Sequence, residues 1–94
     1  MGIVNSVLGP LDTEDLGFTL MHEHVMCQGF VAQNYPELFD DRFMDRIIAG
    51  LSESKKGGVD TIIDATTFDL GRDTTALAEI SERTRVHFIG CTGW

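Results

Sequence analysis

Two histidines, one residue apart, end an apolar run near the start of the chain. His22 and His24 belong to residues 17–25, which read Gly-Phe-Thr-Leu-Met-His-Glu-His-Val. Side chains of a strand alternate between its two faces, so we expect both imidazoles on one face and Glu23 on the other. Neutral imidazole is a common zinc ligand, and most protein zinc sites take four ligands. The pair therefore predicts half of a metal site.

Spacing separates this pair from other histidine motifs. A helical zinc protease needs His-Glu-x-x-His, but Met26 stands three residues after Glu23. A sandwich-type metallohydrolase would place an aspartate at that same position. A cupin-type barrel is all-β, whereas residues 41–57 have helical periodicity. The remaining interpretation is a histidine pair at the carboxyl end of the first strand of a β/α barrel, where catalytic groups of such barrels lie.

Composition limits the classes of partner. The 94 residues are enough for one small folded unit, and 43% of them are hydrophobic, as in ordinary globular chains. The formal charge of −8 opposes binding to nucleic acid or to anionic membranes. No apolar stretch approaches the roughly 20 residues that span a bilayer. We therefore expect no nucleic-acid or membrane partner and a cytoplasmic location.

The elements that must position the histidines alternate along the chain. Residues 3–8 and 17–22 are β-prone with a turn predicted at Gly9 and Pro10, which indicates a short hairpin feeding a buried strand. Further along we expect a helix over 41–57 with an aspartate at its start, a strand over 59–65, a helix from about Asp73 and a strand over 86–91. The expected order is β-α-β-α-β.

This order predicts an α/β fold with a parallel sheet and helices on its faces. Residues 1–94 contain no internal linker, so we expect them to form a single part of one domain. A strand such as 86–91 is of the type that is covered on both sides, and an uncovered apolar edge promotes aggregation. The sequence therefore predicts an incomplete sheet.

Three stretches of the chain resemble the phosphotriesterase family of the amidohydrolase superfamily. They are residues 17–25, residues 58–73 with Thr-Phe-Asp-Leu-Gly-Arg-Asp at 67–73, and Cys-Thr-Gly-Trp at 91–94. The resemblance runs nearly end to end and implies the first three βα units of a (β/α)8 TIM barrel, preceded by an N-terminal β-hairpin. Such a barrel typically needs about 250 residues, so the resemblance implies an incomplete barrel.

The resemblance also implies a binuclear metal site, usually zinc, although other divalent metals are compatible. In this family a bridging hydroxide attacks phosphorus or a carbonyl carbon, and His22 and His24 would ligate the more buried metal. The other family ligands, a carboxylated lysine, two histidines and an aspartate, come from later strands outside this chain. His87 falls at the start of a strand, at the opposite end from the site. We therefore expect the 94 residues alone to be inactive.

Three further positions match the family's substrate pocket more weakly. Trp94 corresponds to an aromatic residue of the leaving-group side, Leu70 to a pocket residue after the second strand, and Cys27 to a position beside the metal ligands. Each has a structural alternative: Trp94 could cover a barrel rim and Leu70 could fill a loop, and neither role is favoured. For Cys27 a packing role is favoured, because no neighbouring cation would activate its thiol.

The polar residues around these positions have assigned roles as well. Asp73 is expected to cap a helix and Arg72 to hold a loop. Asp64 ends a buried strand, and we weigh a structural role against hydrogen bonding behind the metal ligands. Cys27 and Cys91 have no metal-binding or redox spacing and are expected to be free thiols.

The expected activity is metal-dependent hydrolysis of a small-molecule ester. The stretch 67–73 and Trp94 favour a phosphotriester substrate, and a lactone is the alternative within the family. The resemblance implies a homodimer for the complete protein. A rival of another class is a noncatalytic α/β module that binds metal or oligomerises through its open sheet edges. A soluble, monodisperse oligomer of residues 1–94 would favour the module.

Overall fold

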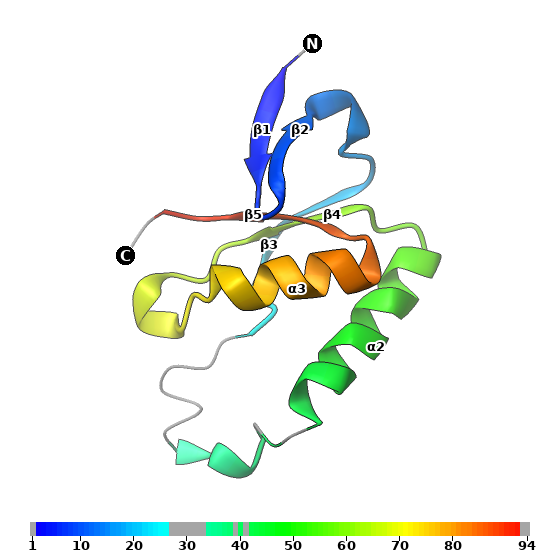
Figure 1. The fold of residues 1–94 in the computed structure, drawn as a ribbon. Helices are drawn as coiled ribbons and strands as arrows, with labels where there is room; N and C mark the ends of the chain where they lie inside the picture. Colours follow the sequence, from blue (N-terminus) through cyan, green and yellow to red (C-terminus); the bar gives the residue numbers. More distant parts are fainter. Residues whose placement is uncertain (1, 27–33, 39, 41, 93–94) are drawn as a thin grey trace.

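Strands and helices alternate after an N-terminal hairpin (Figure 1). The computed structural model describes residues 2–26, 34–38, 40 and 42–92. The strands are β1 (Ile3–Ser6), β2 (Gly9–Asp12), β3 (Thr19–Glu23), β4 (Thr61–Asp64) and β5 (His87–Gly90). The helices are α2 (Phe43–Lys56) and α3 (Thr74–Thr84), with 3-10 turns η1 (Thr13–Asp15), η2 (Pro36–Leu38) and η3 (Phe68–Leu70).

The hairpin is present, but the predicted position of its turn is wrong. Val7 and Leu8 form the turn between β1 and β2, and Gly9 and Pro10 lie within β2. Pro10 pairs with Asn5 in the antiparallel register. Proline is compatible with this place because both strands of a two-stranded sheet are edge strands. The turn therefore closes two residues before the Gly-Pro pair that predicted it.

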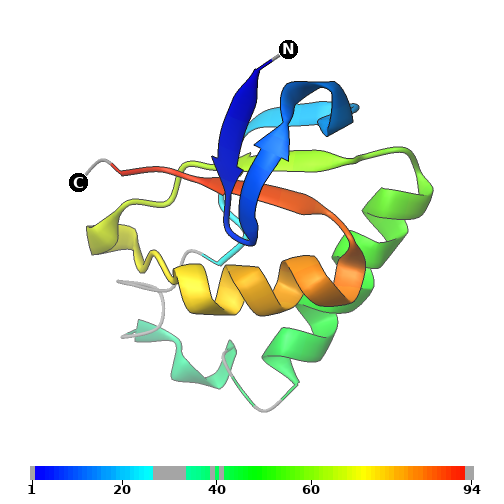
Figure 2. The same ribbon diagram turned by 45° about the horizontal axis from the view of Figure 1, so that its top comes forward.

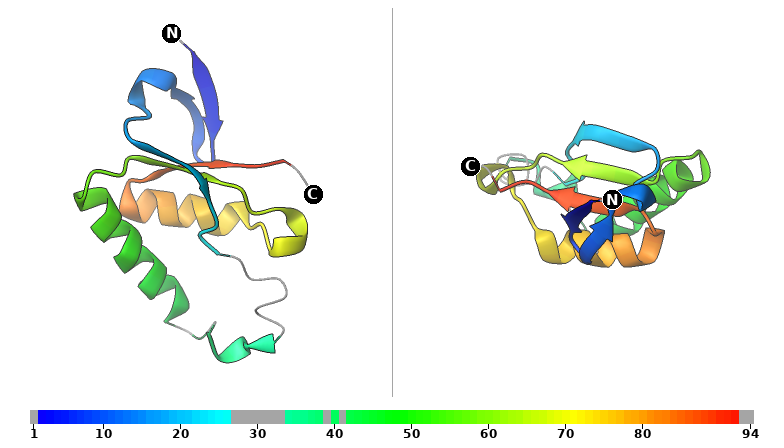
Figure 3. Two further views of the ribbon diagram at one scale, coloured as in Figure 1. Left: turned by 180° about the vertical axis from the view of Figure 1, so that it is seen from behind. Right: turned by 90° about the horizontal axis from the view of Figure 1, so that it is seen from above.

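The three later strands form a parallel sheet in the order β3-β4-β5. The view from above in Figure 3 shows them side by side, with β4 in the centre. One row of the register joins Leu20, Ile62 and Phe88, and the last two of these side chains are buried. The predicted α/β fold with parallel strands is confirmed. Within the described residues the sheet is open, with β3 and β5 at its edges.

The two helices cover one face of this sheet, and the hairpin lies on the opposite side (Figures 1 and 2). The hairpin turn is attached to the sheet by a hydrogen bond from the backbone N–H of Val7 to the carbonyl of Phe88, at 2.9 Å. The core lies between sheet and helices and consists of Met26, Ile62, Leu77, Ile80, Val86 and Phe88. The helical spacing of apolar residues in α2 places these residues against that core: Phe43, Met44, Ile47, Ile48 and Leu51.

The two helix starts differ from each other. Asp73 caps α3, and its carboxylate accepts a hydrogen bond from the backbone N–H of Ala76 at 3.0 Å, as the sequence predicts. The cap of α2 is instead Arg42, whose side chain makes no capping bond. The carboxylate of Asp40 accepts from the Arg42 N–H at 3.0 Å and pairs with Arg46 at 3.1 Å. The predicted aspartate cap of this helix is therefore wrong, because Asp40 lies two residues before the cap position.

Strand β3 is less buried than the sequence predicts. Thr19 and Leu20 are half-buried, whereas residues 21–23 are exposed and Met21 retains 71% of its accessible surface. The reason is the place of β3 at an edge of the described sheet, with the helices on one face only. The expectation of a buried first strand is corrected to a strand that is half-buried at its first two residues and exposed at the other three.

Candidate metal centre

The two histidines lie side by side at the carboxyl end of β3. His22 is the fourth residue of the strand, and His24 follows its last residue. Their ring centroids are 5.2 Å apart, and the rings meet edge to face at an interplanar angle of 77°. Both residues are exposed. The predicted convergence of the two imidazoles is therefore present in the fold.

A β-bulge in β3 allows this arrangement. Leu20 pairs with Ile62 and Glu23 pairs with Asp64, so three steps along β3 match two steps along β4. Unbroken alternation would place His22 on the face of Leu20, which packs against the core. The extra residue interrupts the alternation, because two residues of the bulged strand oppose one of its neighbour. Leu20 is half-buried against the core, and His22, two residues later, is exposed.

The buried carboxylate of Asp64 holds the end of β3 against β4. Its side chain is 2% exposed, and it accepts two backbone hydrogen bonds, from Val25 N–H at 3.1 Å and from Thr66 N–H at 2.8 Å. The carbonyl of Glu23 also accepts from the N–H of Ala65 at 2.8 Å. Of the two roles weighed for Asp64, the structure shows hydrogen bonding directly behind His24. The backbone N–H groups of Val25, Ala65 and Thr66, which follow the ends of the two strands, therefore all have hydrogen-bond acceptors.

Residues of β5 and the following turn complete this end of the sheet. The thiol of Cys91 donates to the Thr66 carbonyl at 3.1 Å, and the Arg72 guanidinium donates to the Cys91 carbonyl at 3.0 Å. The predicted loop-holding role of Arg72 is therefore confirmed. Cys91 is a free thiol, as expected, while Cys27 lies outside the described residues.

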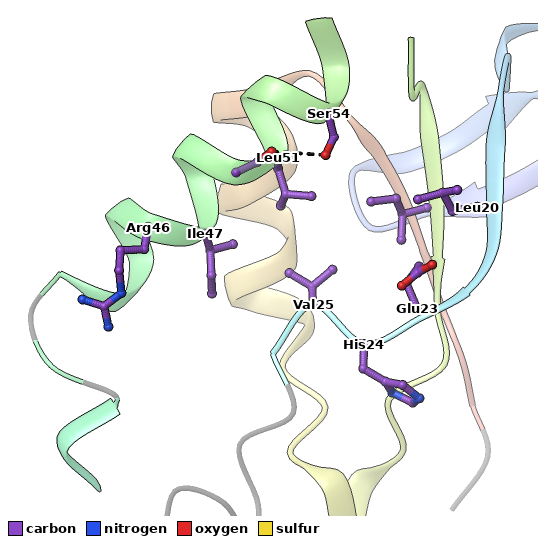
Figure 4. Close-up of a pocket in the computed structure, with 10 residues that line it drawn as sticks. Leu20, Glu23, His24, Val25, Arg46, Ile47, Leu51 and Ser54 are labelled. Carbon is purple, nitrogen blue, oxygen red and sulfur yellow. Dashed lines mark hydrogen bonds between the residues drawn. The ribbon is translucent and has the colours of Figure 1, made fainter. Parts of the chain in front are cut away.

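A groove of about 400 Å³ opens between the end of β3 and α2 (Figure 4). Ile47 and Leu51 of α2 point into it, as does Val25 from the other side, whereas the ring of His24 turns away from the helix. The complete lining is Leu20, Glu23, His24, Val25, Arg46, Ile47, Gly50, Leu51, Ser54 and Ile62. The groove thus adjoins His24, whose imidazole faces away from α2.

Of the three predicted pocket residues, Leu70 alone lies in the described part of the chain. Leu70 is half-buried at the end of η3 and does not line the groove. Trp94 and Cys27 lie outside the described residues. His87 begins β5, at the opposite end of the sheet from His22, as the sequence predicts. The pocket roles of the three residues therefore stay predictions.

One residue of the site was missed by the sequence reasoning. Thr66 lies within hydrogen-bond distance of His24, with 3.1 Å between its hydroxyl oxygen and Nδ1 of the ring. A local signal for the fold of this segment exists, because Asp64 bonding to the N–H two residues later is an Asx turn. Such a turn predicts that Thr66 is held in place, but it does not identify His24 as the partner.

The described residues gather no larger cluster of side chains that could bind a metal ion. Among residues 2–26, 34–38, 40 and 42–92, no group of three or more His, Cys, Asp or Glu side chains is placed to hold a metal ion. Two imidazoles on an exposed strand end suit a divalent metal such as zinc, but they supply only half of a tetrahedral set. Further ligands must come from elsewhere.

Comparison with known proteins decides the family. The family model described as "Phosphotriesterase family" matches residues 2–94. The chain belongs to the phosphotriesterase family. The resemblance seen in the sequence is thereby confirmed.

The curated relatives of this phosphotriesterase-family chain are longer than the chain itself. It is 44% identical over 93 residues to the phosphotriesterase homology protein of Mycobacterium tuberculosis. That match covers 96% of this chain and 28% of that protein. It is 31% identical over 85 residues to the aryldialkylphosphatase of Saccharolobus solfataricus. This second match covers 88% of this chain and 27% of that protein. The chain thus spans less than a third of the length of each of these two relatives.

The fold agrees with the family. A solved structure of the phosphotriesterase from Mycobacterium tuberculosis superimposes with a TM-score of 0.87 at 43% identity, covering 98% of this chain and 29% of that one. Residues 1–94 therefore have an α/β fold that resembles one part of a phosphotriesterase. In the part of the chain that the structure describes, no helix combines the length and the apolar character needed to cross a bilayer.

Proposed function

We propose that this chain is the N-terminal part of a metal-dependent hydrolase barrel and that His22 and His24 are two of its metal ligands. The observation that carries the proposal is the edge-to-face pair of imidazoles, 5.2 Å apart, at the carboxyl end of the first parallel strand. In β/α barrels the catalytic groups come from that end of the strands. Under this proposal residues 1–94 supply the first three βα units of a (β/α)8 barrel.

The residues present fit a zinc ion, and other divalent metals are compatible. Both ligands would be neutral imidazoles, a donor that suits zinc, and both rings are exposed to an incoming ion. When bound, a metal of this kind acidifies water and polarises a P=O or C=O bond. This chain's own contribution is to hold two donors rigidly on a strand that is anchored to β4 by Asp64.

We propose a small-molecule phosphotriester as the substrate. In support, one relative is named aryldialkylphosphatase, and the turn η3 lies in the segment 67–73 that favours this branch of the family. A lactone is the alternative within the same family. We further propose a homodimeric, cytoplasmic protein without nucleic-acid or membrane partners, in keeping with the charge of −8.

The test compares two histidines in the full-length protein. His22→Ala should lower bound metal and esterase activity by more than about 100-fold, the upper range for loss of a group that merely supports a ligand. His87→Ala is the matched control, since this histidine lies at the other end of the sheet, and it should keep the metal. Metal is counted by mass spectrometry, and hydrolysis is followed on a phosphotriester and on a lactone.

Two results would overturn the proposal. One is a purified full-length protein that holds less than one equivalent of divalent metal. The other is a His22→Ala variant that hydrolyses both substrates as fast as the unmodified protein. If the protein hydrolysed the lactone faster than the phosphotriester, the proposed metal site would stand and the proposed substrate would change to a lactone.

A further inference from the structure

The side chain of Thr66, in the loop after β4, reaches one histidine of the pair. Its hydroxyl oxygen lies 3.1 Å from Nδ1 of His24, 42 residues away in the sequence. Thr66 is 3% exposed, so water does not compete freely for this bond. Thr66 is buried and has little freedom to move, whereas His24 is exposed. The hydrogen bond between them therefore orients the His24 ring.

The position of Thr66 is itself determined from two strands. Its backbone N–H donates to Asp64 at 2.8 Å, within β4 and its loop. Its carbonyl accepts from the thiol of Cys91 at 3.1 Å, just beyond β5. These two bonds fix the backbone on either side of the threonine Cα. The hydroxyl is therefore presented to His24 by a rigid segment.

His24 is tied to the same carboxylate. The other oxygen of Asp64 accepts from the backbone N–H of Val25, the residue after His24, at 3.1 Å. One buried carboxylate thus anchors both partners of the Thr66–His24 contact, and their separation does not depend on an exposed loop. The His22 ring meets the His24 ring edge to face, so the orientation of one constrains the other.

We propose that Thr66 is a positioning residue that holds His24 in the tautomer able to bind metal through Nε2. A neutral ring that donates from Nδ1–H to the threonine oxygen leaves Nε2 unprotonated, with a lone pair available to a metal ion. Metal-binding histidines commonly have their second nitrogen held in this way, which sets both the tautomer and the ring orientation. The inference rests on the proposed function for its metal, but the hydrogen bond itself is a property of this chain.

The experiment deletes the hydroxyl and keeps the shape. Thr66→Val removes the acceptor in the full-length protein at nearly constant volume, and Thr66→Ser restores it without the methyl group. Long-range ¹⁵N–¹H correlation on ¹⁵N-histidine-labelled, metal-free protein reports which ring nitrogen of His24 carries the proton, at about pH 8, above the usual histidine pKa of about 6.5. Zinc affinity is measured on the same three proteins by competition with a chelating dye.

The expected result is the Nδ1–H tautomer in the unmodified protein and in Thr66→Ser, and its loss in Thr66→Val. Zinc affinity should fall about 10- to 100-fold in Thr66→Val and return towards the original value in Thr66→Ser. An unchanged tautomer and affinity in Thr66→Val would overturn the inference. So would a Thr66→Ser protein as impaired as Thr66→Val, since the methyl group would then be the part that matters.

Failure of the proposed function is distinguishable from failure of this inference. A full-length protein that binds no zinc overturns the proposed function, whatever the tautomer of His24. A protein that binds zinc equally well with threonine or valine at position 66 retains the metal site and overturns only the positioning role.

Discussion

At the carboxyl end of the parallel sheet, Asp64 accepts hydrogen bonds from the backbone N–H groups of Val25 and Thr66. At the amino end, Asp60 accepts one from the N–H of Phe18 at 3.0 Å and one from the ammonium group of Lys55 at 2.8 Å. Both aspartates join β4 to the chain around β3. Asp64 is buried and accepts from backbone N–H groups, whereas Asp60 is part-exposed and forms an ion pair.

This difference separates the tasks of the two ends. At the amino end the polar groups bind one another and the backbone, and the ion pair closes the junction of β3, α2 and β4. At the carboxyl end the bonds of Asp64 hold backbone, and the two imidazoles next to it stay exposed. In β/α barrels the carboxyl end carries the chemistry and the amino end carries stability. Variants at the two ends should therefore differ in what they disturb.

The largest effect is expected at Asp64. Asp64→Ala would leave two backbone N–H groups at a buried position without their acceptor, which should lower the free energy of unfolding by about 3 kcal/mol. Bound metal should fall as well, because the same carboxylate supports His24. Urea unfolding and metal content of the full-length protein measure the two effects. Asp64→Asn keeps one acceptor oxygen and should lose less of both.

If Asp64→Ala unfolded at the same urea concentration as the unmodified protein, the carboxylate would not hold this end of the sheet. A stable variant with no metal would instead assign Asp64 to the metal site alone. Asp64 would then not be the counterpart of Asp60 in holding β4 to the chain around β3.

The next largest effect is expected at Gly17, at the amino end. Its φ of +64° is unfavourable for other residues, and a Cβ there would collide with the carboxylate of Asp60. Gly17→Ala should therefore lower the free energy of unfolding by about 2 kcal/mol, the left-handed backbone alone costing about 1 kcal/mol. Gly50→Ala is the matched control, because Gly50 lies within α2 with open space around it and should gain up to about 1 kcal/mol.

Metal content per folded molecule should stay unchanged in Gly17→Ala, and this outcome distinguishes the amino end from the carboxyl end. A Gly17→Ala protein that folds but loses its metal would contradict the division of tasks. Equal stability of the Gly17 and Gly50 variants would show that the Asp60 contact is dispensable.

The smallest effect is expected from pH, through Asp60. The hydrogen bond from Lys55 and then that from the Phe18 N–H hold the pKa of Asp60 below its ordinary value of 3.8, and the nearby His87 adds a weaker attraction. Because the folded-state pKa is the lower one, the stabilisation is complete above the unfolded-state pKa and disappears as the pH falls through the folded-state pKa. The pair is part-exposed, so solvent screens it.

Lys55→Met removes the largest cause of this pKa shift and should flatten the acid limb of the stability curve. Urea midpoints measured between about pH 5 and pH 2.5 test this, since that interval begins above the ordinary aspartate pKa and extends below it. Parallel curves for the two proteins would mean that Lys55 does not perturb Asp60 in solution.

Several elements could be predicted from the sequence because they depend on neighbours within a few residues. The apolar spacing in α2, the Asp73 cap of α3 and the β-branched run of β4 are all short-range patterns, and each element is present where expected. The turn at Val7 and Leu8 was misplaced because the Gly-Pro pair signals a break without stating on which side of it the chain reverses.

The sequence by itself determined which residues are candidates for metal binding and in what order strands and helices follow, since His22, His24 and the alternation of periods are visible without any fold. Only the tertiary structure decided the register shift in β3 and the contacts of His24 with Thr66 and of Phe18 with Asp60. Both contacts join residues 42 positions apart. Local periodicity contains no information on such pairs, because the register between parallel strands is set by how the crossover helices pack.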